Sequence, residues 1–457
     1  LPNRECNYMS KKTQKIKTCF SSPLRQFVAS FIALIFSGTA LLLLPGSTVQ
    51  GISLIDALFT STSAVCVTGL IVLDTSKDFT LFGQGVILML IQLGGFGIMT
   101  FSIAIFSFFG SGFSIKWKFT FGSIYNEMQT IPVGSVLKRI ILYTLTIESI
   151  AAVILFFRFL KDFEIKKAIW HSIFHAVSAF CNAGFSTFSS SLMDYREDPV
   201  INITVMITVI LGGLGFIVLT ELIRTEKRKD NLFRRFTLHS KIVLFTTLIL
   251  IVSGAAVILI LEWSHSIKGD PLNVKLLVSF FQSTTCRTAG FNTVDISGLR
   301  ESTLTVMMLL MFIGGAPGSM AGGIKVTTFA VIIGIILSRF KGRKEIVFWH
   351  RGISEEIIHK SATLVILALT VIYISTIILL SLHSFDLHNT FLSVIFEIIS
   401  AFSTVGLSTG ITSAIPEDGK ILISIVMFTG RIGIYAIITA ITAGIKPSLF
   451  RTAEENI

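Results

Sequence analysis

The segment Thr-Cys-Arg-Thr-Ala-Gly-Phe-Asn at residues 285–292 decides the fold, because its pattern occurs four times in the chain. Aligned on the glycine, the copies are spaced by 106 to 116 residues, and the glycines are Gly69, Gly184, Gly290 and Gly406. A phenylalanine lies ten residues before each glycine, and a hydroxyl side chain lies six residues before it: Phe59, Phe174, Phe280 and Phe396, and Ser63, Ser178, Thr284 and Ser400. Self-similarity at a fixed period indicates a repeat architecture.

The composition places these repeats in a membrane. Of 457 residues, 52% are hydrophobic and only 14% are charged, whereas a soluble domain needs roughly a quarter of charged residues. Eight apolar stretches are long enough to cross a hydrocarbon core of roughly 30 Å. They are residues 27–44, 82–109, 140–160, 200–222, 242–261, 304–337, 362–382 and 421–445.

Shorter, half-polar segments lie between successive pairs of these stretches. They are 12 to 14 residues long, at 52–65, 168–180, 274–285 and 390–402, too short to span, and so are predicted as re-entrant helices. The predicted fold is an all-α integral membrane protein in which four tandem repeats of span, short helix, filter and span surround a pseudo-fourfold central pore. The predicted repeats are 23–110, 137–223, 240–338 and 359–445, with an N-terminal segment 1–22 and a tail 446–457.

The basic residues indicate the orientation. The formal net charge is +11, which alone would be compatible with nucleic-acid binding. However, 25 of the 38 Lys and Arg residues lie in alternate flanks, at 1–25, 110–139, 223–241, 339–360 and 446–457. The positive-inside rule places these flanks and both termini in the cytoplasm. Membrane orientation thus explains the charge without a nucleic acid, and the five cysteines show neither metal-ligand spacing nor an even number.

The four glycines suggest a specific role for the loops after the short helices. Irregular backbone at membrane depth is tolerated only where it is buried in protein or lines a water-filled path. Backbone carbonyls around an axis can replace the hydration shell of a cation, and glycine adopts the left-handed conformation needed there at low cost. The alternative is that these glycines only permit close helix packing. For the later clusters at 94–97, 212–215 and 430–433, packing and hinge roles are equally open.

The third repeat contains an interruption in its second span. Residues 314–323 hold five glycines and a proline, each of which costs roughly 1 to 3 kcal/mol inside a helix. This segment is therefore predicted to be a loop inside the membrane, with a static kink as the alternative. Arg431 occupies the place of Gly95, Gly213 and Gly315 in the other repeats. A guanidinium at that depth is a functional candidate unless it pairs with an acid, for which Glu148 is available.

Other charged or polar residues near the repeats have structural explanations. Arg287, three residues before Gly290, is predicted to point backward and support the loop through Asp295 or Glu397, because facing the axis it would repel cations. His171 and His175 have no third metal ligand nearby and are predicted to be packing residues. The acids Asp56, Asp74, Asp78 and Asp194 are predicted on the outer side, where they either concentrate cations or are simply solvated.

The motifs resemble the Trk/Ktr/HKT superfamily of potassium transporters, which includes bacterial Trk and Ktr membrane subunits. The resemblance covers about residues 23–447. Its signatures are Ala-Val-Cys-Val-Thr-Gly-Leu at 64–70, the opening segment at 285–292, Gly-Ser-Met-Ala-Gly-Gly-Ile-Lys at 318–325 and Gly-Arg-Ile-Gly at 430–433. Only about 22 residues precede the first repeat, and the chain is therefore expected to be of the Ktr type, without the additional N-terminal hairpin of Trk subunits.

The resemblance implies a K⁺ pore with a selectivity filter and a gate. The implied filter residues are Val67, Thr68, Gly69, Leu70, Asn182, Ala183, Gly184, Phe185, Thr288, Ala289, Gly290, Phe291, Thr404, Val405, Gly406 and Leu407. The implied gate residues are Gly314, Gly315, Ala316, Pro317, Gly318, Ser319, Met320, Ala321, Gly322, Gly323, Lys325 and Arg431, although Lys325 could equally extend to the cytoplasmic surface. K⁺ is the implied transported ion, and Na⁺ is a second candidate. Each repeat has one glycine where a tetrameric K⁺ channel has Gly-Tyr-Gly, so K⁺ selectivity over Na⁺ is expected to be real but weaker and concentrated at one level.

Partners and location follow from the same resemblance. It implies a homodimer in the bacterial plasma membrane, whose cytoplasmic face binds a ring of regulatory subunits, and nucleotide acts only through that ring. The basic loops 224–241 and 339–360 are the candidate docking surface. No convergent acid, base or metal residues appear in the predicted spans, so an enzyme is not expected. The alternative is a secondary cation symporter that couples Na⁺ or H⁺ to K⁺ or another solute, although such proteins usually have inverted repeats and these run parallel.

Overall fold

The structure is a computed structural model that describes residues 23–110, 133–224, 236–343, 345–382 and 390–434. The regular secondary structure in these ranges is helical, apart from a short antiparallel hairpin of β1 (Val347–Phe348) and β2 (Arg351–Gly352). The predicted all-α class is confirmed. The predicted segments 1–22 and 446–457, and the end of the fourth repeat after residue 434, lie outside the described residues.

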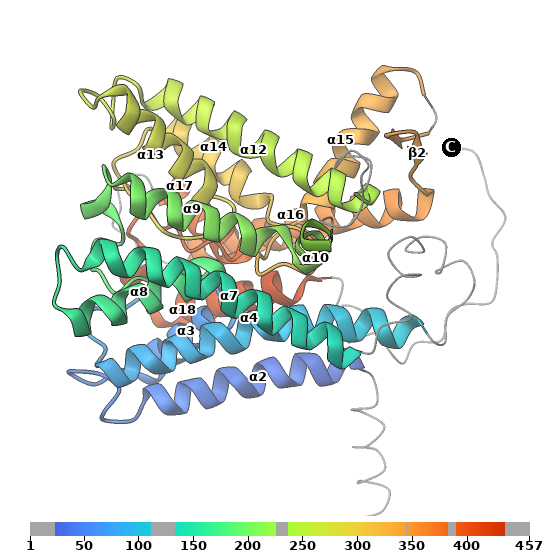
Figure 1. Cartoon of the computed structure of the whole chain (residues 1–457). Helices are drawn as coiled ribbons and strands as arrows, with labels where there is room; N and C mark the ends of the chain where they lie inside the picture. Colours follow the sequence, from blue (N-terminus) through green and yellow to red (C-terminus); the bar gives the residue numbers. More distant parts are fainter. Residues whose placement is uncertain (1–22, 111–132, 225–235, 344, 383–389, 435–457) are drawn as a thin grey trace, which may run out of the picture.

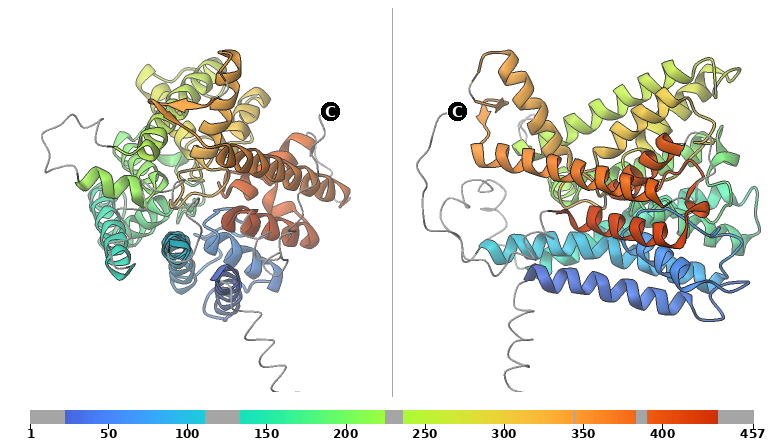
Figure 2. Two further views of the ribbon diagram at one scale, coloured as in Figure 1. Left: turned by 90° about the vertical axis from the view of Figure 1, so that its right-hand side faces the viewer. Right: turned by 180° about the vertical axis from the view of Figure 1, so that it is seen from behind.

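Each predicted repeat begins with a long apolar helix followed by a short one. The long helices are α2 (Pro23–Leu42), α7 (Val133–Phe159), α12 (Leu238–Glu262) and α16 (Glu355–Ser381), and these four are long and apolar enough to cross a membrane. The short helices are α3 (Leu54–Val65), α8 (Ile165–Phe180), α13 (Leu272–Thr285) and α17 (Thr390–Ser403). Each short helix packs on the long helix before it (Figure 1). In the left view of Figure 2, the four units follow one another around a common centre.

The second spans of the repeats differ from one another. They are α4 (Leu81–Gly110), the pair α9 (Pro199–Leu214) and α10 (Phe216–Arg224), the pair α14 (Glu301–Phe312) and α15 (Val326–Phe340), and α18 (Glu417–Ile432). The interruption between α14 and α15 was predicted. The prediction of 200–222 as one continuous span is wrong, because α9 and α10 meet at Gly215 with a bend of 104°. Gly215 has φ 80°, a left-handed value that glycine adopts without strain.

Local sequence signals explain where several helices begin. Ser53 and Thr237 are the N-caps of α3 and α12, where their hydroxyls accept the amides of Asp56 and Ser240. Asp198, which directly precedes Pro199, is the N-cap of α9, and its carboxylate accepts two backbone amides of the first turn. Such caps satisfy amides that have no partner inside the helix. Two single-turn 3₁₀ helices, η1 (Met193–Tyr195) and η3 (Thr412–Ala414), lie in the segments between the short helices and the second spans.

The third repeat has a one-residue shift that the sequence alignment did not predict. Phe59, Phe174 and Phe396 are fully buried, whereas Phe280 is 37% exposed and its neighbour Phe281 is buried instead. In the other repeats, the backbone amide of the residue just before the glycine donates to a carbonyl six residues before that glycine, as the Thr68 amide does to the Ser63 carbonyl. In the third repeat, the Ala289 amide donates to the carbonyl of Thr285, only five residues before the glycine. The loop of the third repeat is therefore one residue shorter, and Phe281 and Thr285 are the matching residues.

Glycines let the second spans contact the ends of the short helices. A Cβ added to Gly94 would lie 2.0 Å from the Val65 carbonyl oxygen, and one on Gly212 would lie 2.0 Å from that of Phe180. At Gly430 the corresponding distance, to the Phe402 oxygen, is 1.6 Å. Real Cβ atoms do not approach carbonyl oxygens this closely. The sequence left packing and hinge roles open for the clusters at 94–97, 212–215 and 430–433. For the first glycine of each cluster, the structure supports packing.

Replacing Gly94 by Ala should destabilise the protein, because the Cβ would force α4 away from the end of α3. Overpacking of this kind typically costs about 1 to 3 kcal/mol. Gly85→Ala on the same helix is the matched control, since its Cβ would meet only Trp170, at 3.9 Å. Thermal unfolding of the purified variants in detergent measures the difference, and equal transition temperatures for the two variants would contradict the packing argument.

Candidate functional site

The four aligned glycines form a closed ring where the four units meet. Their φ angles are all left-handed: 91° at Gly69, 68° at Gly184, 79° at Gly290 and 89° at Gly406. A Cβ on Gly69 would lie 2.3 Å from the Ala183 carbonyl oxygen, and one on Gly406 would lie 2.2 Å from that of Thr68. The corresponding distances are 2.5 Å from Gly290 to the Val405 oxygen and 3.0 Å from Gly184 to the Ala289 oxygen. No side chain fits here without displacing backbone. We call these four residues the glycine ring.

The backbone, rather than the side chains, makes up this ring. The apolar residue after each glycine is at most 1% exposed, and these residues are Leu70, Phe185, Phe291 and Leu407. Two residues before each glycine stands a second left-handed residue that is not glycine: Val67, Asn182, Thr288 and Thr404, with φ between 51° and 70°. The sequence predicted only one left-handed position, the glycine, in each of these four backbone segments. A non-glycine residue keeps such a conformation only where its surroundings fix it.

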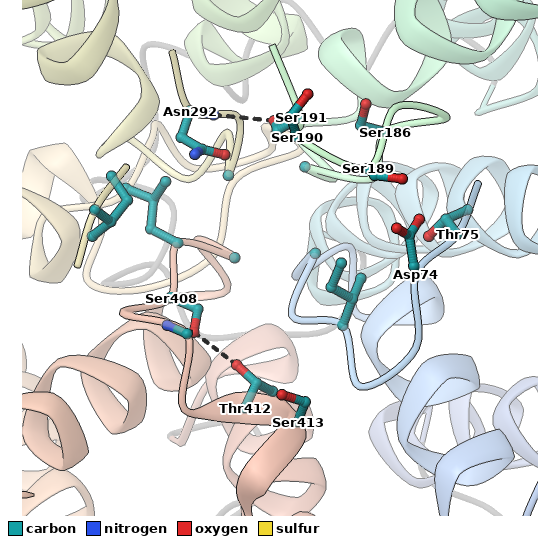
Figure 3. A pocket seen from close by; sticks show the side chains of 18 of the residues that line it. Asp74, Thr75, Ser186, Ser189, Ser190, Ser191, Asn292, Ser408, Thr412 and Ser413 are labelled. Carbon is teal, nitrogen blue, oxygen red and sulfur yellow. Dashed lines mark hydrogen bonds between the residues drawn. The ribbon is translucent and has the colours of Figure 1, made fainter. Parts of the chain in front are cut away.

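A polar cavity of about 350 Å³ opens on one side of the glycine ring. All four glycines line it, together with hydroxyl, amide and carboxylate side chains from every repeat, such as Asp74, Ser191, Asn292 and Ser408 (Figure 3). Hydroxyl, amide and carboxylate oxygens in the wall can bind a cation or the water around it. The cavity, here called the outer cavity, reaches the glycine ring.

Asp74 is the one of the four predicted outer acids that lines this cavity. Burial alone would raise the pKa of its carboxyl, but hydrogen bonds from Ser189 and Ser76 lower the pKa below its usual value. The carboxylate therefore remains charged at physiological pH. Asp56 is instead paired with Lys420 at 2.6 Å, and Asp194 accepts a hydrogen bond from Ser190.

The predicted loop at 314–323, here called the membrane loop, lies against the break between α9 and α10. Its residues Ala316, Ser319, Met320 and Ala321 are at most 1% exposed. The amides of Ala316 and Met320 donate to the carbonyls of Gly213 and Gly212, at 2.9 and 3.1 Å. Because α9 ends at Leu214, those carbonyls have no helical partner of their own. The broken helix thus supplies the acceptors for the irregular backbone of the loop.

Three basic side chains bind carbonyl oxygens of the membrane loop. Lys325 Nζ donates to Ala321 at 2.7 Å, Arg431 Nη1 donates to Met320, and Arg287 Nη2 donates to Gly314 at 3.1 Å. Arg431 therefore contacts the membrane loop. Glu148 instead accepts from the Gln92 side chain at 3.2 Å, and no bond joins it to Arg431 within the described residues.

The predicted carboxylate partners of Arg287 are wrong. Asp295 is bound by Ser297, and Glu397 accepts from Thr412 on the outer side. Arg287 does point backward and is only 7% exposed, but its partner is the backbone of the membrane loop. It therefore connects the strand of the glycine ring to that loop.

The sequence analysis did not recognise a set of four buried polar residues, one per repeat, at the position after the buried phenylalanine of each short helix. These are Thr60, His175, Gln282 and Glu397, all at most 2% exposed. His175 was predicted to be a packing residue, but its Nε2 lies 3.0 Å from Ser186 Oγ in the outer cavity. In the described part of the chain, no three His, Cys, Asp or Glu side chains form a group that could hold a metal ion.

An all-helical membrane protein with a ring of backbone carbonyls below a polar cavity is a membrane transport protein by class. The chain belongs to the TrkH family, because residues 4–448 match the family model described as "TrkH: Cation transport protein". It is 39% identical to the Ktr system potassium uptake protein B of Bacillus subtilis over 425 residues, which covers 93% of this chain and 94% of the relative.

Further relatives show the same relationship. The Ktr system potassium uptake protein B of Vibrio alginolyticus is 34% identical, with 95% of this chain and 94% of the relative covered. The potassium/sodium uptake protein NtpJ of Enterococcus hirae is also 34% identical, with 95% and 97% covered. The crystal structure of the potassium transporter TrkH from Vibrio parahaemolyticus superposes with a TM-score of 0.73 at 19% identity, covering 94% of this chain and 86% of that one, which supports the fold.

The charge of Asp74 should attract cations into the outer cavity. Asp74→Asn is expected to raise the half-saturating cation concentration for uptake by about two- to threefold at low ionic strength, and less in high salt because of screening. Since the pKa of Asp74 is lowered, the difference should persist down to about pH 5. Asp418→Asn, which removes an exposed acid outside the cavity, is the control. Identical uptake curves for the wild type and Asp74→Asn would contradict this role.

Proposed function

We propose that this chain forms a pathway for K⁺ uptake across the bacterial plasma membrane. The observation that carries the proposal is the closed glycine ring, in which backbone carbonyls of all four repeats meet below a polar cavity. The potassium uptake proteins among the relatives support K⁺ as the ion. The potassium/sodium name of the Enterococcus hirae relative keeps Na⁺ as a second candidate, either carried or required.

The proposed selectivity filter is the backbone around the ring, from two residues before each glycine to one after it. A K⁺ ion would exchange water oxygens for carbonyl oxygens as it passes the ring. At the glycines the four segments are too close for any side chain to fit between them, so discrimination against Na⁺ is expected mainly at that level. An inside-negative membrane potential would drive uptake with about 2.3 kcal/mol per charge per 100 mV.

The membrane loop is the proposed gate. It is buried, it is bound to the break at Gly215, and its carbonyls are held by Lys325, Arg431 and Arg287. Opening would require these hydrogen bonds to change together. We propose that a cytosolic nucleotide-binding ring subunit drives this change through the basic loops at 224–241 and 339–360, and that two copies of the chain form the membrane unit with both termini in the cytoplasm.

Growth on limiting K⁺ tests the proposed pathway. A cell that lacks its own K⁺ uptake systems should be rescued by the wild-type chain expressed with a suitable ring subunit. Gly290→Ser should raise the K⁺ requirement about tenfold or more, because a side chain at φ 79° would be strained and its Cβ would lie 2.5 Å from the Val405 carbonyl. Gly298→Ser, at a more open outer position, is the matched control.

Two outcomes would count against this pathway. Normal growth of the Gly290→Ser strain, with the same K⁺/Na⁺ competition as wild type, would refute the filter assignment. Failure of the wild-type chain to rescue growth, although it is present in the membrane with the ring subunit, would favour the symporter alternative.

Removal of the membrane loop tests the gate. Deletion of residues 316–322 should raise the maximal K⁺ flux if the loop obstructs the pathway. Arg431→Gln should raise it less, since it removes one of the three cations that hold the loop. Lys268→Gln, an exposed outer substitution, controls for the loss of a positive charge. Flux measured in proteoliposomes reports the outcome, and unaltered or abolished flux from a correctly folded deletion variant would contradict the obstructing role.

A further inference from the structure

The short helices carry a second polar row behind the glycine ring. The first row is the matched hydroxyls: Ser63 and Ser400 accept the amides of Gly69 and Gly406, while Ser178 and Thr285 donate to the carbonyls of Phe185 and Phe291. The second row lies one helical turn earlier and consists of Thr60, His175, Gln282 and Glu397, here called the second-row residues. The first-row hydroxyls therefore bind the backbone of the ring glycines or of the residues directly after them.

Three of the second-row residues contact the chain beyond the ring. His175 Nε2 lies 3.0 Å from the hydroxyl of Ser186, and Gln282 Nε2 donates to Thr293 Oγ1 at 3.3 Å. Glu397 accepts the hydroxyl of Thr412. In each case the partner follows the ring glycine by two to six residues. These contacts therefore tie the outer part of the loop to the short helix.

The contact of Glu397 reaches further than the others. Thr412 Oγ1 also lies 2.9 Å from Ser408 Oγ, and both hydroxyls line the outer cavity, as Figure 3 shows. One buried carboxyl thus positions two hydroxyls, one of them only two residues after Gly406. His175 and Gln282 each contact a single hydroxyl. The Thr60 hydroxyl has no hydrogen-bond partner in the part of the chain that the structure describes.

We infer that Glu397 is a positioning residue for ion discrimination, which fixes the outer part of the fourth filter loop through Thr412 and Ser408. His175 and Gln282 do the same for the second and third loops. The carbonyls of the glycine ring can favour one ion size only while the chain that carries them is held in place. The anchors act through the loop and do not touch the ion. This inference rests on the proposed K⁺ pathway.

The experiment compares Na⁺ inhibition of K⁺ uptake in five variants. Glu397→Ala and Thr412→Val should each weaken discrimination against Na⁺ about tenfold, the effect expected when a buried hydrogen bond to a carboxyl is lost. Glu397→Gln keeps an oxygen acceptor of the same shape and should stay within about twofold of wild type. The double variant Glu397→Ala/Thr412→Val should be no worse than either single variant, because the two side chains form one contact.

Thr60→Val is the matched control at the same position of the first repeat. It removes a buried hydroxyl that makes no hydrogen bond in the described structure and keeps the side-chain volume, so discrimination should stay within about twofold of wild type. Thr412→Val also keeps the volume of the residue. It therefore carries the test if Glu397→Ala does not reach the membrane.

The outcomes separate this inference from the proposed function. Wild-type K⁺ uptake with unchanged discrimination in Thr412→Val and Glu397→Ala would overturn the positioning role alone. So would additive effects in the double variant, or a loss in Glu397→Gln as large as in Glu397→Ala, which would indicate a role for the charge itself. Absence of K⁺ uptake by the wild type would overturn the proposed function and this inference together.

Discussion

The structure depends on one constraint: irregular backbone at membrane depth must find hydrogen-bond partners inside the protein or face a path for water and ions. At the glycine ring, left-handed backbone lets segments of all four repeats approach so closely that no side chain fits between them. Elsewhere the irregular backbone is paired. The short helices supply hydroxyls to the loops around the ring, and the broken end of α9 supplies carbonyls to the membrane loop.

The same constraint explains three cations in an apolar setting. A buried guanidinium or ammonium is costly unless it is paired, and Lys325, Arg431 and Arg287 all donate to carbonyls that the interruption of α14 and α15 releases from helical bonding. Arg287 lies in the segment that carries Gly290, whereas Lys325 and Arg431 lie in second spans. The Arg287 side chain therefore connects the membrane loop to the segment that carries Gly290, and a movement of residue 314 would change the support of that segment.

Much of this arrangement was predictable because its signals are local. A left-handed glycine, a run of helix breakers and an apolar stretch of span length each act on their own segment of chain, and the repeats, the ring glycines and the membrane loop follow from them. The partner of Arg287 and the bend at Gly215 depend on tertiary contacts, which no single segment encodes. The shift in the third repeat was hidden because Phe280 and Phe281, and Thr284 and Thr285, are identical neighbours. Burial distinguishes the two phenylalanines, and the hydrogen bond from the Ala289 amide distinguishes the two threonines.

That shift also concealed the second-row residues. Counted back from each glycine, the position holds Thr60, His175, Phe281 and Glu397, and a phenylalanine in the third copy hides the polar pattern. With the loop one residue shorter, the matching residue is Gln282, and all four copies become polar and buried. Their side chains differ because the hydroxyls they meet lie two, three or six residues beyond the glycine. The four repeats thus share one backbone geometry at the ring, but a different side-chain contact supports each segment behind it. The four segments therefore need not contribute equally to ion discrimination.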